Sequence, residues 1–578
     1  MARIEGAHYS TEKEHNYSLL ISLIINAAIL AAVFIFTDLM YETNDEFGIA
    51  AKIADGFPYI GFVNYYLCEA LIFIQKYLTG INVFVLSQIV MSFLSFTALL
   101  KVYLDNRVTA VDGILAAVVI AFYSLDHYSS LQFTKTSALL MAAGLIVLAD
   151  TYTHNRSILG FLAAIFLFYI GVGYRERGMF PSLAFAGIFM IIWFFRNRKE
   201  FYEGRSVIAE ILLFIVIAAL AVAPYGIDKM SDKMNASTPE LKAYREYQAE
   251  RVKITDYPLY EYYEENSDKY DAIGLSENDV YLVSHWFLDY DGAASYDNLV
   301  KINEINYPCV VRDRSVVKAA KQFASRVVSS AKDRGFTAMH IAILIVLSIY
   351  ILLTVRPGAW WYMIFIGAAA AGMYVLIFYL GRAQYRAFYV MDVSATMWML
   401  YVLAQREERW GKSKGRIFGI LVCLLATAAV CVLFVPAREN LINQSSNIRD
   451  KIQSDEMTQF YIDHEDTFYV CTTGSKKRHP SYLTPLKVPV VERNATGTGG
   501  WGTLAPYELE QLAEYGMTNL VGDLIDNDNA IYLGRAKQKR LAEYYNKWYA
   551  EEGTTIRFVK LGEVGDKGLY KVVREPQQ

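Results

Sequence analysis

Charged side chains interrupt a chain that is otherwise rich in apolar residues, and their types suit phosphate chemistry. Glu42, Asp45 and Glu46 follow directly on the first apolar run, in the stretch "MYETNDEFG". A carboxylate can take a proton from an attacking hydroxyl, whereas Lys and Arg bind phosphate oxygens. Cations beside other apolar runs are Lys135 in "LQFTKTSALLM", Arg175 and Arg177 in "GYRERG", and Arg382 and Arg386 in "GRAQYR". These types suit transfer of a group from a phosphate leaving group, provided that they share one side of a membrane.

The composition indicates a membrane protein with sizeable soluble regions. The chain has 578 residues, of which 54% are hydrophobic and 20% are charged, more charge than a chain lying wholly in lipid would carry. Its net charge of -4 gives no basic bias, so we expect no nucleic-acid partner. The five cysteines form no CxxC pair, which argues against a zinc site and a disulfide framework and leaves a Cys309–Cys471 pair open.

The apolar runs predict membrane-spanning helices, since a span needs about 20 mostly apolar residues. The candidates are 18–40, 81–103, 109–125, 131–150, 157–173, 179–195, 206–226, 337–355, 359–380, 387–405 and 417–435. The first run has no cleavage site before the acidic segment, so we interpret it as a retained helix. The segment 57–80 is apolar but carries Asn64, Glu69 and Lys76, and is either a span or a surface helix.

The distribution of basic loops favours one orientation. A cytoplasmic N-terminus and a surface helix at 57–80 place the basic loops 101–107, 196–205 and 406–416 in the cytoplasm. The acidic segment, the lysine and the arginine-bearing loops then share the outer face. The basic segment 311–335 also lies outside in this layout, either as a solvated helix or as a surface helix that touches anionic lipid headgroups.

We therefore predict a mainly α, polytopic membrane protein of about 11 transmembrane helices, with surface helices in its first outer loop and a C-terminal extracytoplasmic α/β domain. The expected strands 467–473, 529–533 and 555–562 belong to that domain, as does a helix at 534–553. The expected regions are an N-terminal transmembrane region at residues 1–226 with an acidic first outer loop 41–80, a mostly helical extracytoplasmic loop domain 227–336, C-terminal transmembrane helices 337–435, and the α/β domain 436–578.

Each candidate also has a simpler interpretation. Lys135 either serves a function within its span or extends to the outer interface. The arginines are either phosphate ligands or ordinary loop charges, and Glu176 in the second case neutralises a neighbour. The glycine-rich stretch 492–504 is a turn, or it presents Trp501 to a sugar ring.

Short motifs resemble the GT-C superfamily of integral-membrane glycosyltransferases. Asn44 and Asp45 with Glu46 match the acidic motif of that superfamily's first outer loop, and "FVNYYLCEALIFIQKYLTG" resembles the surface helix that follows it. "QFTKTSALL" and "GYRERGMF" are similar to segments of bacterial GtrII-like glucosyltransferases, which are linked to cell-surface polysaccharide. The resemblance covers roughly residues 15–400.

The resemblance implies a bacterial plasma-membrane enzyme of the cell envelope, with a cytoplasmic N-terminus. Its donor would be a polyprenyl-phosphate sugar, and its acceptor a glycan or lipid-linked molecule outside the cytoplasm. Asp45 would be the catalytic base, with Glu46 as second choice. A strict Asp-x-Asp is absent, which leaves a divalent cation, Mg²⁺ or Mn²⁺, open, with Asp45 and Glu46 as its ligands if one binds. The phosphate-binding candidates that the resemblance supplies are Lys135, Arg175, Arg177, Arg382 and Arg386.

Two other functions fit the same sequence. A transporter or flippase of a lipid-linked glycan needs ionisable residues near the middle of the bilayer, and Asp392 in "FYVMDVSATM" is a deeper one. A non-catalytic membrane assembly protein needs no cavity above Asp45.

Overall fold

In the computed structural model, the chain forms two compact units. Unit 1 comprises Met1–Asp232, Val316–Ser446 and Leu483–Pro489, and unit 2 comprises Lys233–Ser315, Asn447–Tyr482 and Val490–Gln578. The structure describes the chain apart from residues 1, 43, 107–108, 156, 205–206, 258, 333–334, 406–434, 436–437, 451–455, 472–482, 491–492, 535–537, 566 and 578.

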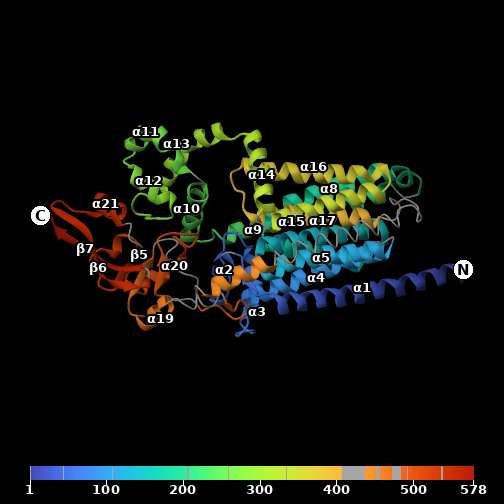
Figure 1. Cartoon of the computed structure of the whole chain (residues 1–578), viewed down its shortest axis with the longest axis horizontal. Coiled ribbons are helices and arrows are strands. Elements are labelled where there is room, and N and C mark those ends of the chain that lie inside the picture. Colours follow the sequence, from blue (N-terminus) through green and yellow to red (C-terminus); the bar gives the residue numbers. More distant parts are fainter. Residues whose placement is uncertain are drawn as a thin grey trace. The chain divides into compact units, whose positions relative to one another are not determined.

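Unit 1 is a helical bundle (Figure 1). Eight helices in the described part of the chain are long and apolar enough to cross a membrane. Its elements are α1 (Ala2–Phe36), β1 (Met40–Tyr41), α2 (Asn44–Ala54), α3 (Tyr65–Gln75), α4 (Val83–Asn106), α5 (Ala110–Ser129), β2 (Ser130–Leu131), α6 (Phe133–Asp150), α7 (Ile158–Tyr174), α8 (Met179–Gly204), α9 (Val207–Met234), α14 (Val316–Lys332), α15 (Phe336–Thr354), α16 (Trp360–Tyr379) and α17 (Tyr385–Ala404).

The predicted number of spans is confirmed only in part. The eight candidates lie in α1, α4, α5, α6, α8, α15, α16 and α17. Helix α7 has 17 residues, or about 25 Å, and is counted among the shorter apolar helices. Helix α9 covers the run predicted at 206–226, whereas the run at 417–435 lies outside the described residues.

The segment 57–80 does not form a spanning helix. Its helix α3 has 11 residues, which cover about 16 Å of a hydrocarbon core about 30 Å thick. Asn64 caps its start by accepting a hydrogen bond from the backbone N–H of Tyr66 at 3.1 Å. Cys68, Leu71 and Ile72 are buried in a small hydrophobic cluster. The short helix fits the surface-helix alternative.

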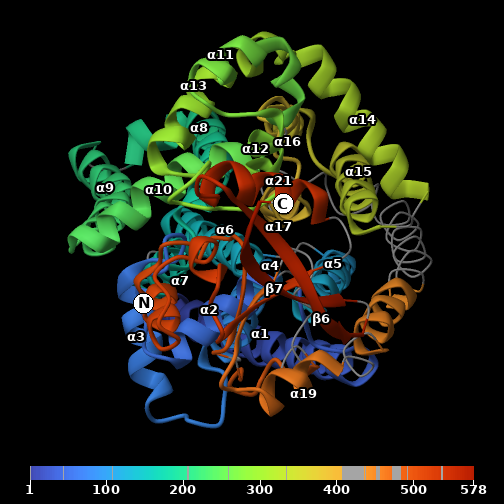
Figure 2. The ribbon, with the colours of Figure 1, turned by 90° about the vertical axis from the view of Figure 1, so that its left-hand side faces the viewer.

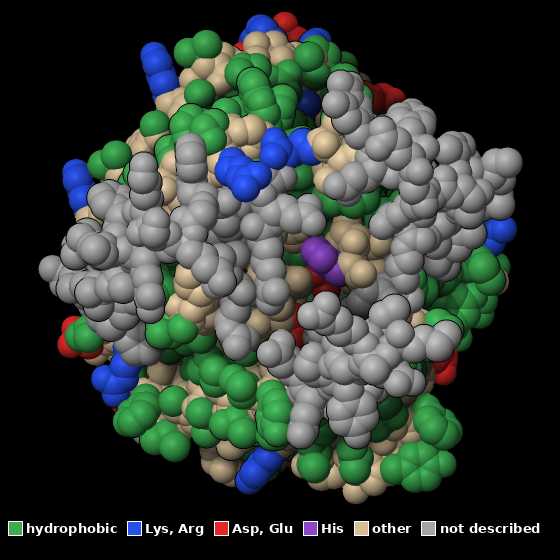
Figure 3. Space-filling model, turned by 90° about the vertical axis from the view of Figure 1, so that its right-hand side faces the viewer, with side chains coloured by type: hydrophobic (Ala, Val, Ile, Leu, Met, Phe, Trp, Pro, Cys, Tyr) green, Lys and Arg blue, Asp and Glu red, His purple; other side chains and the backbone are tan. Residues whose placement is uncertain are grey.

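The connections of the bundle bring distant parts of the sequence to one end. At one end of the bundle, the chain leaves α1, α5, α7 and α16 and enters α4, α6, α8, α15 and α17 (Figure 1). The loops between these helices therefore lie together at that end. We call it the site end. Figure 3 views the opposite end, around which hydrophobic side chains form much of the described surface, as expected of helices in contact with lipid.

Unit 2 contains a mixed five-stranded sheet of order β4-β3-β5-β7-β6. Strands β4, β3 and β5 are parallel, and β7 runs antiparallel to both of its neighbours. The hairpin of β6 and β7 is its longest pairing (Figure 2). The elements are α10 (Pro239–Thr255), α11 (Ser267–Ala272), α12 (Glu277–Ser284), α13 (Tyr296–Asp313), α19 (Glu456–Asp463), β3 (Phe468–Cys471), β4 (Ala495–Gly497), α20 (Pro506–Ala513), β5 (Ala530–Gly534), α21 (Gln538–Tyr549), β6 (Thr554–Val564) and β7 (Lys567–Pro576).

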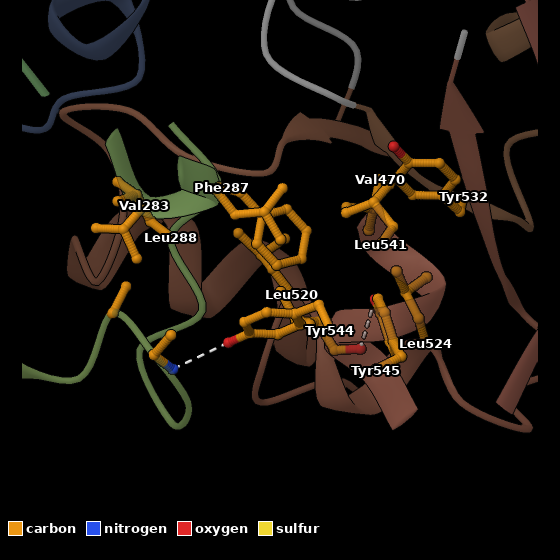
Figure 4. Close-up of a cluster of buried hydrophobic side chains, with 14 of the residues drawn as sticks. Val283, Phe287, Leu288, Val470, Leu520, Leu524, Tyr532, Leu541, Tyr544 and Tyr545 are labelled. Atoms are coloured by element: carbon orange, nitrogen blue, oxygen red, sulfur yellow. Dashed lines mark hydrogen bonds between the residues drawn. The ribbon is translucent and has the colours of Figure 1, made fainter. Parts of the chain in front are cut away.

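The two long polar stretches share one hydrophobic core, although the sequence suggested separate domains 227–336 and 436–578. Phe287 and Leu288 from the first stretch pack with Tyr544 and Leu520 from the second (Figure 4). The rings of Phe287 and Tyr544 lie edge to face with centroids 5.1 Å apart. Because these aromatic and aliphatic side chains are buried in one shared cluster, their burial joins the two stretches into one unit.

Candidate functional site

A short parallel pairing positions the acidic segment at the site end. Met40 and Tyr41 of β1 pair with Ser130 and Leu131 of β2, and the backbone N–H of Glu42 donates to the carbonyl of Leu131 at 3.0 Å. Since β2 directly precedes α6, this pairing brings the Glu42 carboxylate to the first turn of that helix.

The segment Leu483–Pro489 holds the same region from another side. Asn82 donates from its side-chain amide to the carbonyl of Pro485 at 2.9 Å and to the Tyr41 hydroxyl at 3.0 Å. The backbone N–H of Asn82 donates to the carbonyl of Leu486 at 2.8 Å. Three segments far apart in sequence therefore fix the backbone from which the acidic loop starts.

Lys135 is fully buried rather than extended to the interface. Its Nζ lies 2.9 Å from Asp126 Oδ1, 3.0 Å from the Asp126 carbonyl and 3.5 Å from Glu42 Oε2. The rings of Tyr389 and Tyr385 lie 5.1 and 5.8 Å from the ammonium. Burying an ammonium is costly unless it is paired, and here two carboxylates and a carbonyl compensate for lost water.

Two neighbouring acidic residues on α2 have different environments. Asp45 keeps about a quarter of its side chain exposed, at 24%, and its Oδ2 lies 3.7 Å from a terminal nitrogen of Arg386. Glu46, the next residue, is 0% exposed. Of this pair, Asp45 is the carboxylate that a reactant could reach.

Burial also changes the proton affinity of Glu42, which lies outside the spanning segments. It raises the pKa of the Glu42 carboxyl above its usual value; Lys135 opposes this shift, and the negative charge of Asp126 adds to it. Glu42 is therefore both a partner of Lys135 and a group able to accept a proton.

The predicted arginines converge on this end to different degrees. Burial lowers the pKa of Arg175 to about 10; Glu176 opposes this shift, and the positive charges of Arg386, Arg177 and Arg382 add to it. The Arg175 guanidinium also lies 5.2 Å from the Phe133 ring centroid.

Arg177 is 73% exposed and its Nε lies 3.4 Å from Glu176 Oε1, as the loop-charge interpretation expected. The structure thus brings Arg386 and Arg175 into the cluster and leaves Arg177 at its edge.

Sequence reasoning missed Tyr385, His340 and Tyr374, which support this cluster. Tyr385 donates from its hydroxyl to Asp126 Oδ2 at 2.6 Å, and the buried His340 places Nε2 3.8 Å from the same oxygen. His340 Nδ1 lies 3.4 Å from Asp392 Oδ2, and Tyr374 donates to Asp392. His340 could have been found as an ionisable residue inside an apolar run, the same feature that the sequence shows for Asp392.

The carboxylates of this cluster face cations and hydroxyls. Among the described residues, no group of three His, Cys, Asp or Glu side chains has a metal-binding arrangement. Asp45 faces Arg386, and Glu42 and Asp126 face Lys135. This donor set fits neutralisation of an anion by side chains better than it fits a divalent cation.

The chain as a whole has few recognisable relatives among known proteins. No protein-family model matches it, and no curated protein matches it. One similar solved structure is that of ArnT from Cupriavidus metallidurans in the apo state, with a TM-score of 0.39 and 9% sequence identity over 95% of this chain and 97% of that chain. A TM-score of 0.39 does not establish a shared fold, so the chemistry of the site follows from its own geometry.

Proposed function

We propose that this chain is a membrane glycosyltransferase of the GT-C type that uses a polyprenyl-phosphate sugar as donor. The observation that carries the proposal is the cluster at the site end, where an accessible carboxylate, Asp45, lies beside Arg386, and Glu42, three residues earlier in the chain, contacts the buried Lys135. The acceptor would be a cell-surface glycan or a lipid-linked molecule on the outer face of a bacterial plasma membrane, as in GtrII-like enzymes.

The proposed reaction exchanges one bond at the anomeric carbon. The acceptor hydroxyl oxygen forms a bond to that carbon and gives its proton to Asp45, while the bond from the carbon to the phosphate oxygen breaks. Polyprenyl phosphate leaves with the bonding electrons. Arg386 and Arg175 stabilise its added negative charge, with Arg382 and Arg177 at the edge of the cluster.

Lys135 contributes a buried positive charge next to Glu42 of the acidic loop. Its Nζ is already bound to Asp126, and Glu42 is the more distant of its two carboxylate partners. A donor phosphate would approach Lys135 on the Glu42 side. In this proposal the side-chain cations neutralise the phosphate, and no step requires Mg²⁺ or Mn²⁺.

A transporter of a lipid-linked glycan is the second candidate. The observation in its favour is the buried His340–Asp392 pair inside two candidate spans. Asp392 is the eighth residue of α17, about 10 Å from its start, which is short of the middle of a hydrocarbon core about 30 Å thick. The charges therefore concentrate at one end, as catalysis at a membrane surface requires.

The test is release of polyprenyl phosphate from a panel of polyprenyl-phosphate sugars by the full-length protein in nanodiscs, with oligosaccharides added to supply the acceptor hydroxyl. Asp45→Asn should lower the rate of release at least about 100-fold, because general-base catalysis contributes about 10² to 10⁴. Asp55→Asn, a change at an exposed position just after the same helix, is the matched control and should retain the native rate.

Two outcomes would contradict this proposal. Full activity of Asp45→Asn combined with loss in Glu42→Gln would move the role of base to Glu42. Movement of intact donor across the membrane without release of polyprenyl phosphate would instead support the transporter.

A further inference from the structure

Helix α14 is a basic helix that the sequence alone left with two interpretations. It carries Lys318, Lys321, Arg326 and Lys332, and its 17 residues include no Asp or Glu. It runs across the ends of α15 and α16 rather than along them (Figure 1), and Figure 2 also shows it beside α15. Since α15 and α16 are candidate spans, this position corresponds to the edge of a bilayer.

One portion of the apolar face of α14 packs against the bundle. Ala319 is 1% exposed, and the Phe323 ring stacks on Tyr374 of α16 with centroids 4.6 Å apart. These contacts fix the orientation of α14 about its own axis.

The other portion of the apolar face is exposed. Val317 and Val328 are 64% and 55% exposed, and the three alanines between or beside them on that face are exposed as well. At 100° per residue these five side chains form a continuous stripe next to the buried one. The stripe consists of Val317, Ala320, Ala324, Val328 and Ala331.

Three cations of α14 have no protein partner within the described part of the chain. Lys321, Arg326 and Lys332 are exposed, and the structure records neither an ion pair nor a hydrogen bond for their side chains. Helical spacing places Lys321 and Lys332 along the border of the exposed stripe. Apolar side chains bordered by unpaired lysines are typical of helices that lie in the membrane interface.

The neighbouring helices also expose apolar side chains. Ile345 and Ile349 of α15 are 54% and 46% exposed, and Phe365 of α16 is 49% exposed. We propose that α14 is an interfacial helix that binds anionic phospholipid, with the exposed stripe at the acyl-chain boundary and the bordering Lys321 and Lys332 on the phosphate headgroups. This surface is independent of the reaction proposed for the site end.

The test compares binding of phosphatidylglycerol and phosphatidylcholine with the same acyl chains to the full-length protein, by native mass spectrometry. The native protein should prefer phosphatidylglycerol. In the double variant Lys321→Gln, Lys332→Gln the apparent affinity for phosphatidylglycerol should fall about 25-fold, since each cation near an anionic surface contributes about fivefold. Affinity for phosphatidylcholine should stay within about twofold of the native value, because its headgroup has no net charge.

The matched control removes two exposed lysines of unit 2, as Lys242→Gln, Lys301→Gln, and should bind both lipids as the native protein does. A second measurement requires no variant: raising the salt concentration should remove the native preference, because exposed charges are screened. Equal binding of the two lipids by the native protein would overturn the proposal. So would a native preference that survives in the double variant or at high salt.

Discussion

Two buried aspartates, one in each unit, have contrasting partners. Asp126 at the site end contacts the ammonium of Lys135 and accepts from the hydroxyl of Tyr385. Asp289 in unit 2 has neutral donors instead, since Tyr544 and Tyr549 donate their hydroxyls to its Oδ2 at 2.8 and 2.6 Å.

The different partners distinguish a charged site at Asp126 from a structural network of neutral hydrogen bonds at Asp289. Burial raises the pKa of Asp289, while the hydrogen bonds from Tyr549 and Tyr544 oppose that shift. These bonds join the chain near 289 to α21, so Asp289 connects the two stretches that form unit 2. Asp126 instead contacts the ammonium of Lys135, which Glu42 also contacts, and fold stability alone does not require such a buried charged group.

The first prediction removes the charge of Asp126. Asp126→Asn leaves Lys135 buried with Glu42 as its remaining carboxylate partner, so the free energy of unfolding should fall by about 3–5 kcal/mol. Unfolding by SDS titration in mixed micelles measures it. Asp232→Asn is the control, because Asp232 pairs with an exposed lysine, Lys229, and should cost less than about 1 kcal/mol. Equal losses of unfolding free energy in both variants would contradict the role of Asp126 as a stabilising partner of the buried Lys135.

The second prediction compares two arginines of the site end. Arg386→Gln should weaken binding of polyprenyl phosphate about 10- to 100-fold, as expected for loss of a charge-assisted hydrogen bond. Arg177→Gln should change binding less than about threefold, since Arg177 is 73% exposed. Isothermal calorimetry in detergent measures both, and the reverse order would contradict the placement of Arg386 at the centre of the cluster.

The third prediction applies the same neutral substitution to unit 2. Asp289→Asn retains an acceptor for a tyrosine hydroxyl, so the cost should be about 1 kcal/mol at neutral pH. Because the pKa of Asp289 is raised by folding, its neutral form stabilises the fold below the unfolded pKa, and this stability is lost as pH rises through the folded pKa. Lowering the pH from 7 to 4 should therefore stabilise the native protein relative to Asp289→Asn. Hydrogen exchange of α21 amides reports it; a constant difference would contradict the raised pKa.

The fourth prediction concerns metal removal and has the smallest expected effect. EDTA should change polyprenyl phosphate release less than about twofold, because side-chain cations face the carboxylates of the cluster. Loss of activity that Mg²⁺ or Mn²⁺ restores would contradict this aspect of the proposal.

The sequence predicted the apolar helices well because each follows from a local run of residues. It also identified Lys135, whose charge inside such a run is a local feature. It did not predict the pairing of Tyr41 with Leu131, because residues 90 apart meet only through the fold. Nor did it predict β7, whose register with β5 depends on the same long-range packing that joins the halves of unit 2. The contrast between Asp45 and Glu46 likewise depends on how α2 is oriented.

The most direct test of the central claim compares undecaprenyl phosphate with undecaprenol, which differ only in the phosphate. If the cations of the site end bind a lipid phosphate, undecaprenyl phosphate should raise the melting temperature of the full-length protein in detergent and undecaprenol should not. Arg386→Gln should remove most of that increase. Equal stabilisation by the two lipids, or an increase that Arg386→Gln leaves unchanged, would contradict the account.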